Sequence, residues 1–167
     1  MTMPISIDTK DRSVRSLLWF TLITYMILLT KFVLFKKSPG YIKNHFLHHY
    51  SLGMAKSNLW HGAHLVPFHT VKMYLADNMP LKYAVINLAG NFLGFMPLAI
   101  LLPLLFNRLR SASATILCVF LVSLGFEIFQ LITLLGVCDI DDLILNTMGG
   151  IAGYMVFWFM TKFFVIH

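Results

Sequence analysis

The stretch that decides the fold is ASATILCVFLVSLGFEIFQLITLL, residues 112–135, in which Glu127 is the single charged residue. An α-helix rises about 1.5 Å per residue, so about 20 apolar residues cross the roughly 30 Å hydrocarbon layer of a membrane. Further apolar runs of similar length cover residues 16–35, 83–106 and 143–165. The sequence therefore predicts an all-α, polytopic transmembrane bundle of about four spans, forming a single domain over residues 1–167.

The composition excludes a soluble globular domain. Of 167 residues, 58% are hydrophobic and 12% are charged, whereas soluble domains average about 45–50% apolar and about 25% charged residues. A net charge of +6 at pH 7 is common in nucleic-acid binders, but here Lys and Arg flank the apolar runs instead of covering a soluble surface. Such flanks suit lipid headgroups, so we expect membrane lipids and no nucleic acid as partners.

The long segment between the first two spans, residues 36–82, is predicted to lie outside the cell. Short loops near the spans dominate the positive-inside rule, and the short basic flanks are the N-terminal one and the turn with Arg108 and Arg110. We therefore expect a cytoplasmic N-terminus. The apolar second half of the outer segment indicates an interfacial position or one over the mouth of the bundle. Pro67 predicts a short helix after it.

Glu127 is the most informative polar residue, because it falls inside the third span. A charge at mid-bilayer costs at least about 2.5–3.5 kcal/mol, so this carboxyl group must be paired, protonated or in contact with a wet cavity. Gln130 lies three residues later and therefore on the same helix face. One interpretation is a hydrogen bond that only fixes packing. The interpretation that we favour is a cavity open to the outer side.

Two further pairs of residues share helix faces. Asn87 and Asn91, four residues apart in the second span, are typical of hydrogen-bonding contacts between membrane helices. Gly149 and Gly153 form a small-xxx-small pair in the fourth span, which indicates close helix packing. The same glycine pair could instead dock another membrane protein or a second copy of the chain.

An acidic run opens the fourth span. Asp139 can cap the helix, and acids in the first turn suit the helix dipole, but Asp141 and Asp142 add more charge than capping needs. Asp142 and Asn146 are four residues apart and share a face, where a cation or a cationic ligand group could bind. The run is not an EF-hand loop, and the histidines of residues 36–82 lack an H-E-x-x-H motif. We predict neither a metal nor a cofactor.

These residues fall into four strings whose order and spacing resemble the VanZ-like family across roughly residues 58–160. The strings are His64-Leu-Val-Pro-Phe-His-Thr-Val71, Asn87 to Asn91-Phe-Leu-Gly-Phe-Met-Pro97, Phe126-Glu-Ile-Phe-Gln130, and Asp139-Ile-Asp-Asp142 to Asn146-Thr-Met-Gly-Gly150. The chain departs from the pattern at Gly136, where many members have an arginine. If that arginine normally pairs with an aspartate, the acids of this chain are freer to bind something else.

The resemblance implies a protein of the bacterial plasma membrane that is associated with low-level resistance to teicoplanin, a lipoglycopeptide. We expect a non-enzymatic protein of the cell envelope, whose outward polar cavity engages a lipid-linked cell-wall precursor or a lipid-tailed molecule. The candidate ligand-binding residues are Asn87, Asn91, Glu127, Gln130, Asp139, Asp141, Asp142, Asn146, Pro67 and Phe68. One alternative is a membrane enzyme that modifies a lipid headgroup or a precursor, with Glu127 or Asp142 as general base. Another is an assembly partner of a second membrane protein.

Overall fold

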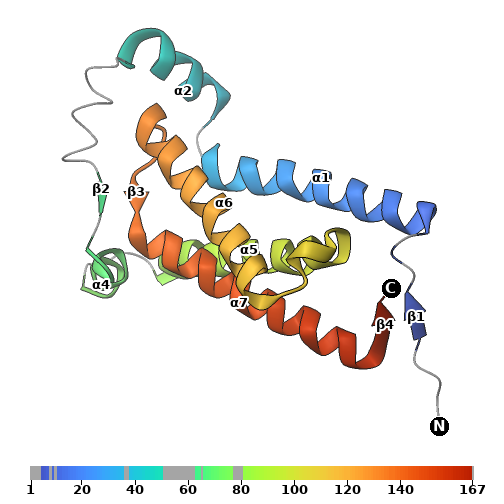
Figure 1. Cartoon of the computed structure of the whole chain (residues 1–167). Helices are drawn as coiled ribbons and strands as arrows, with labels where there is room; N and C mark the ends of the chain where they lie inside the picture. The colour runs from blue at the N-terminus through green and yellow to red at the C-terminus, as the bar shows by residue number, and fades with distance from the viewer. Residues whose placement is uncertain are drawn as a thin grey trace.

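Four long helices make up most of the protein (Figure 1). They are α1 (Arg12–Leu34), α5 (Leu81–Leu105), α6 (Ala112–Thr133) and α7 (Ile140–Phe163). The computed structural model describes residues 5–7, 9, 11–35, 38–50, 63–64, 66–76 and 81–166. Each of the long helices is long and apolar enough to cross a membrane. The predicted all-α, polytopic bundle is therefore confirmed.

Side-chain caps explain why two helices begin earlier than the apolar runs. The carboxylate of Asp11 accepts hydrogen bonds from the backbone N–H groups of Ser13 (2.8 Å) and Val14 (3.2 Å), so α1 begins at Arg12. In the same way, Oδ1 of Asp139 accepts from the N–H of Asp141 at 2.8 Å, as predicted for a capping residue. Because the cap satisfies an N–H group at the helix start, α7 begins at Ile140 instead of residue 143.

Helices α5 and α7 pack closely against each other. A Cβ atom placed on Gly149 would lie 2.0 Å from the carbonyl oxygen of Phe92, and one on Gly153 would lie 2.2 Å from that of Met96. Both distances are far below a van der Waals contact, so only glycine permits this approach. The predicted role of the glycine pair in packing is confirmed. Both glycines are buried against α5, and the pair does not form an exposed docking face.

The bundle has a small apolar core and a large apolar exterior. Leu29, Phe95 and Val119 are buried where α1, α5 and α6 meet. Facing outward, Leu17 and Phe20 of α1 are 65% and 68% exposed. Such faces suit lipid chains, because hydrocarbon solvates them as well as a protein core would.

Polar bonds between helices attach α1 to its neighbours. The hydroxyl of Tyr25 donates to the carbonyl of Gly94 in α5. The side-chain amide of Gln130 in α6 donates to the carbonyl of Val33 at 3.0 Å. Interhelical hydrogen bonds of this kind hold membrane helices together where apolar attraction contributes little.

Short elements lie at the two ends of the bundle. Helix α2 (Pro39–Asn44) runs into the π-helical turn η1 (His45–His49), and α4 (His69–Ala76) follows Pro67 as predicted. The turn between α5 and α6 contains the 3-10 helix η2 (Asn107–Leu109). Strands β1 (Ile5–Ile7) and β4 (Phe164–Ile166) pair in parallel, as do β2 (Ala63–His64) and β3 (Cys138–Asp139). Residues 36–37, 51–62, 65 and 77–80 of the predicted outer segment lie outside the described residues.

The two ends of the bundle carry different kinds of charged residue. Helices α2 and α4 lie with β2 and β3 at one end, and β1 and β4 lie at the opposite one (Figure 1). We call the first the acidic end, because it contains Glu127, Asp139, Asp141 and Asp142, although Lys43 of α2 and Lys72 of α4 lie there as well. We call the second the basic end, which comprises the start of α1 and the α5–α6 turn and contains Arg12, Arg15, Arg108 and Arg110.

Candidate functional site

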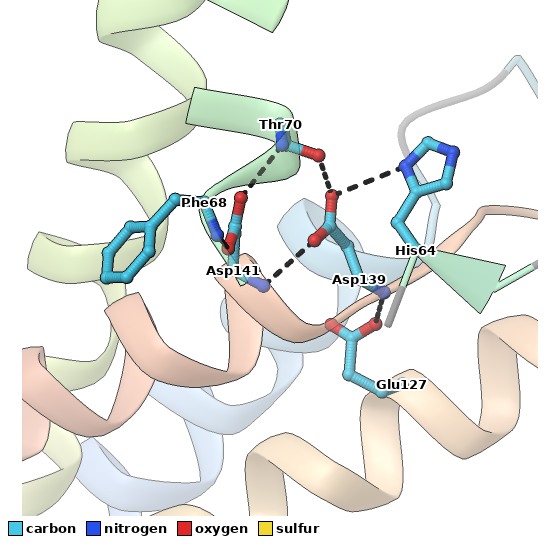
Figure 2. A network of polar contacts seen from close by, with 6 residues as sticks. All are labelled: His64, Phe68, Thr70, Glu127, Asp139 and Asp141. Atoms are coloured by element: carbon cyan, nitrogen blue, oxygen red, sulfur yellow. Dashed lines mark hydrogen bonds and ion pairs between the residues drawn. The ribbon is translucent and has the colours of Figure 1, made fainter. Parts of the chain in front are cut away.

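The carboxylate of Asp141 holds the turn that leads into α4. Its Oδ1 accepts from the N–H of Phe68 at 2.5 Å, and its Oδ2 accepts from the N–H of Thr70 at 2.9 Å (Figure 2). The first N–H groups of a helix have no acceptor within the helix itself. Because Asp141 belongs to α7 and is only 2% exposed, it caps α4 from another helix and fastens that helix to the bundle.

The turn before α4 has a strained backbone. Phe68 has a φ of 63°, in the left-handed region that costs a bulky residue about 1–2 kcal/mol. The hydrogen bond from its N–H to Asp141 holds this conformation. The ring of Phe68 is 58% exposed and points away from the carboxylates (Figure 2). Pro67, the preceding candidate residue, is exposed as well. The turn therefore displays apolar groups at the acidic end.

Asp139 and Glu127 connect α4 and α7 to α6. The hydroxyl of Thr70 donates to Oδ2 of Asp139, and the N–H of Asp139 donates to Oε2 of Glu127 at 2.9 Å. Glu127 is 2% exposed, so the carboxyl group that was expected to be costly in the membrane is bonded to the start of α7. Nδ1 of His64 lies 3.8 Å from Oδ2 of Asp139, close enough for an ion pair when the imidazole is protonated.

We call the hydrogen-bonded group of Phe68, Thr70, Glu127, Asp139 and Asp141 the network. A cleft of about 440 Å³ lies beside it. Its polar lining consists of His64, Thr70, Asn87, Gln130, Asp139 and Asp142. Apolar side chains complete the wall, among them Val33, Leu34 and Val137. Among the described residues, no three His, Cys, Asp or Glu side chains form a group that could hold a metal ion. The cleft thus offers hydrogen-bonding groups next to apolar surface.

The candidate residues predicted from the sequence separate into three groups. Asn87, Gln130, Asp139 and Asp142 line the cleft, and Glu127, Asp139, Asp141 and Phe68 belong to the network. Asn91 and Asn146, 4% and 1% exposed, lie inside the bundle, where the amide of Asn146 donates to the hydroxyl of Ser123 at 2.8 Å. His64 and Thr70 were not selected from the sequence, although both belong to the first family-like string.

The expectation that the acids are freer without a nearby arginine is not met for Asp139 and Asp141. Their oxygens accept from backbone N–H groups and from a threonine hydroxyl instead. The glycine at position 136 has a different role, since a Cβ atom there would lie 2.8 Å from the side chain of Gln130. Gly136 therefore leaves room for Gln130 at the edge of the cleft.

The pKa of the Cys138 thiol depends on the charge of the neighbouring carboxyl groups. Burial raises the pKa of its thiol above the ordinary value, and the negative charges of Glu127 and Asp139 raise it further. A thiolate at this position is disfavoured by both effects. The reactivity of Cys138 therefore depends on the ionisation of the neighbouring carboxyl groups.

A comparison with known protein families identifies the family to which this chain belongs. A family model described as VanZ/LLP1 matches residues 22–161. The chain belongs to the VanZ/LLP1 family. The match includes all the acids of the acidic end and most of the α1–α7 bundle, which confirms the resemblance seen in the sequence. No curated protein and no solved structure matches this VanZ/LLP1 chain.

Proposed function

We propose that this VanZ/LLP1 protein reduces susceptibility to teicoplanin by binding a lipid-linked or lipid-tailed molecule in the cleft at its acidic end. It acts in the bacterial plasma membrane as a non-enzymatic protein of the cell envelope. The observation that carries the proposal is the mixed lining of the cleft, which places His64, Asn87 and Asp142 beside apolar side chains. An amphiphile needs both kinds of surface, one for its headgroup and one for its chain.

The position of the cleft suits a ligand that stays partly in the membrane. Val33 and Leu34 are the last residues of α1 and line the part of the cleft next to the spans. The exposed ring of Phe68 adds an apolar contact at the same end. A lipid-linked precursor or a lipid-tailed glycopeptide could therefore place its polar part against His64 and Asp142 while its chain remains in hydrocarbon.

The hydrogen bonds at the acidic end favour binding over catalysis. A general base must be free to take a proton from the substrate. Oε2 of Glu127, one of the two candidate bases, instead accepts from the backbone N–H of Asp139. Both oxygens of Asp141 likewise accept from backbone N–H groups. These acids position α4 and the start of α7, and so build the walls of the cleft.

The orientation is part of the proposal. Arg15 at the start of α1 and Arg108 in the short α5–α6 turn lie at the basic end. The positive-inside rule gives short basic loops near the spans the greatest weight. It therefore places the basic end and the N-terminus in the cytoplasm, and the cleft on the outer side.

The proposal is tested with a variant that fills the cleft and leaves the residues of the network unchanged. Val137 lines the cleft and is 49% exposed, so a Val137→Trp variant puts an indole into it. The matched control is Ile132→Trp, because Ile132 of α6 is 50% exposed and does not line the cleft. Teicoplanin and vancomycin susceptibility is measured in a sensitive host at equal expression of each protein.

Wild type and Ile132→Trp should raise the teicoplanin concentration needed for inhibition, with little change for vancomycin, and Val137→Trp should lose the rise. A rise that Val137→Trp retains would refute the cleft as the binding site. If membranes with the wild-type protein contain a covalently altered lipid that is missing with Glu127→Gln, the protein is an enzyme and the binding proposal is wrong.

A further inference from the structure

The basic end contains a second polar cleft, distinct from the one at the acidic end. It has a volume of about 260 Å³ and lies between the start of α1 and the α5–α6 turn. Its polar lining consists of Thr9, Arg15, Asn107 and Arg108. Two guanidinium groups from separate elements thus border one small cavity.

No described residue neutralises these two arginines. The one described ion pair is that of His64 with Asp139 at the acidic end. Asp11, the nearest described acid in the sequence, accepts from the N–H groups at the start of α1. In the same turn as Arg108, Nε and Nη2 of Arg110 are buried and find no acceptor among the described residues. The basic end therefore has strong donors, and none of its arginines takes part in a described ion pair.

An apolar groove continues from this cleft along the bundle. The groove has a volume of about 500 Å³ and is lined by residues of α1, α5 and α6, including Leu22, Leu98 and Val122. Phe106 and Arg108 line both the groove and the polar cleft. The two cavities are therefore neighbours, with charge at the end of the spans and hydrocarbon surface beside them.

We infer that these joined cavities bind an anionic phospholipid. Its phosphate lies between Arg15 and Arg108, and one of its acyl chains lies in the groove between α1, α5 and α6. Arginine suits this ligand because its planar group donates two parallel hydrogen bonds to phosphate oxygens. Basic pockets at the ends of membrane helices lie at the depth of the lipid phosphates. A free phosphate ion would bind the arginines but would leave the apolar groove empty.

The inference is tested on the purified full-length protein in detergent. Binding of phosphatidylglycerol is measured by native mass spectrometry for wild type, Arg15→Gln, Arg108→Gln and the double variant. Arg12→Gln is the matched control, because Arg12 lies in the same helical turn of α1, is exposed and does not line the cleft. At about 1 kcal/mol per basic residue, each cleft variant should weaken binding about 5-fold and the double variant about 30-fold. Arg12→Gln should bind like wild type.

A second measurement separates a lipid from a free anion. Cys118 lines the apolar groove, so a bound acyl chain should slow its alkylation by N-ethylmaleimide in a Cys138→Ser background. Phosphatidylglycerol should slow the reaction, whereas inorganic phosphate and phosphatidylcholine should not. Three results would overturn the inference: equal weakening by Arg12→Gln, absence of phosphatidylglycerol binding, or equal protection of Cys118 by phosphatidylcholine. Competition by inorganic phosphate at similar concentrations would indicate an anion site instead of a lipid site.

Discussion

The acidic and basic ends of the bundle use charge in opposite ways. At the acidic end, Glu127, Asp139 and Asp141 accept hydrogen bonds from other parts of the chain, most of them from backbone N–H groups. At the basic end, Arg15 and Arg108 border a cavity and have no described acidic partner. The acids hold the fold together, whereas the arginines are available to a ligand. The number of charged residues at a membrane surface therefore does not reveal which of them support the fold.

The largest effect is expected where an acid is removed from the network. Asp141→Ala leaves the N–H groups of Phe68 and Thr70 without their acceptor. Two hydrogen bonds to a buried charge are lost, so the variant should be less stable by about 3–5 kcal/mol. Thermal unfolding in detergent measures this loss. Asp141→Asn, which keeps one acceptor oxygen, should lose less. An Asp141→Ala protein that unfolds at the wild-type temperature would show that the network does not stabilise the fold.

A smaller loss is expected for the hydroxyl group in the network. Thr70→Val keeps the shape of the side chain and the backbone N–H but removes the donor to Asp139. The expected destabilisation is about 1–2 kcal/mol, because Thr70 is buried and its acceptor is charged. The control is Thr133→Val, since the hydroxyl of Thr133 donates to the carbonyl of Phe129 in its own helix. Equal losses in the two variants would contradict a special role for the Asp139 bond.

The charge of the acidic end should be visible at Cys138. Glu127 and Asp139 raise the pKa of this thiol, so removing the charge in Glu127→Gln should lower that pKa. The midpoint of alkylation by a maleimide should then move to lower pH, and the reaction at neutral pH should become faster, because the thiolate is the nucleophile. Asp142→Asn is the control, because the carboxylates that raise this pKa are those of Glu127 and Asp139. An unchanged pH profile in Glu127→Gln would indicate that Glu127 is uncharged in the folded protein.

The smallest effect on stability is expected at the basic end. Arg15 and Arg108 are exposed, and replacing either by Gln should change the free energy of unfolding by no more than about 0.5 kcal/mol. The same thermal unfolding experiment measures it. A loss comparable to that of Asp141→Ala would remove the contrast between the two ends.

The fold could be predicted because each span is encoded locally. An apolar run such as residues 112–135 is sufficient to predict a helix that crosses a membrane. The start of α7 was predicted three residues late, at 143 instead of 140, because Asp139 adds a polar turn to the helix through its cap. A polar turn of this kind is missed when a span is predicted from its apolar run alone.

The candidate site could be predicted only in part. The acids of residues 139–142 were recognised because three carboxyl groups within four residues are more than helix capping needs. Their partners could not be recognised, since Phe68 and Thr70 are separated from Asp141 by 73 and 71 residues. Asn91 and Asn146 were grouped with the site because helical spacing shows that residues share a face. Spacing does not show which way that face points, and both side chains turn into the bundle.

The central claim is that Asp141 caps α4 across the bundle, and amide hydrogen exchange of Thr70 tests it most directly. Thr70 lies in the first turn of α4, where a helix provides no acceptor of its own. Lys72 is the internal control, because its N–H donates to the carbonyl of Phe68 instead of to a carboxylate. The account predicts slow exchange of Thr70 in wild type and faster exchange in Asp141→Ala. Exchange of Thr70 at the unprotected rate in the wild-type protein would contradict it.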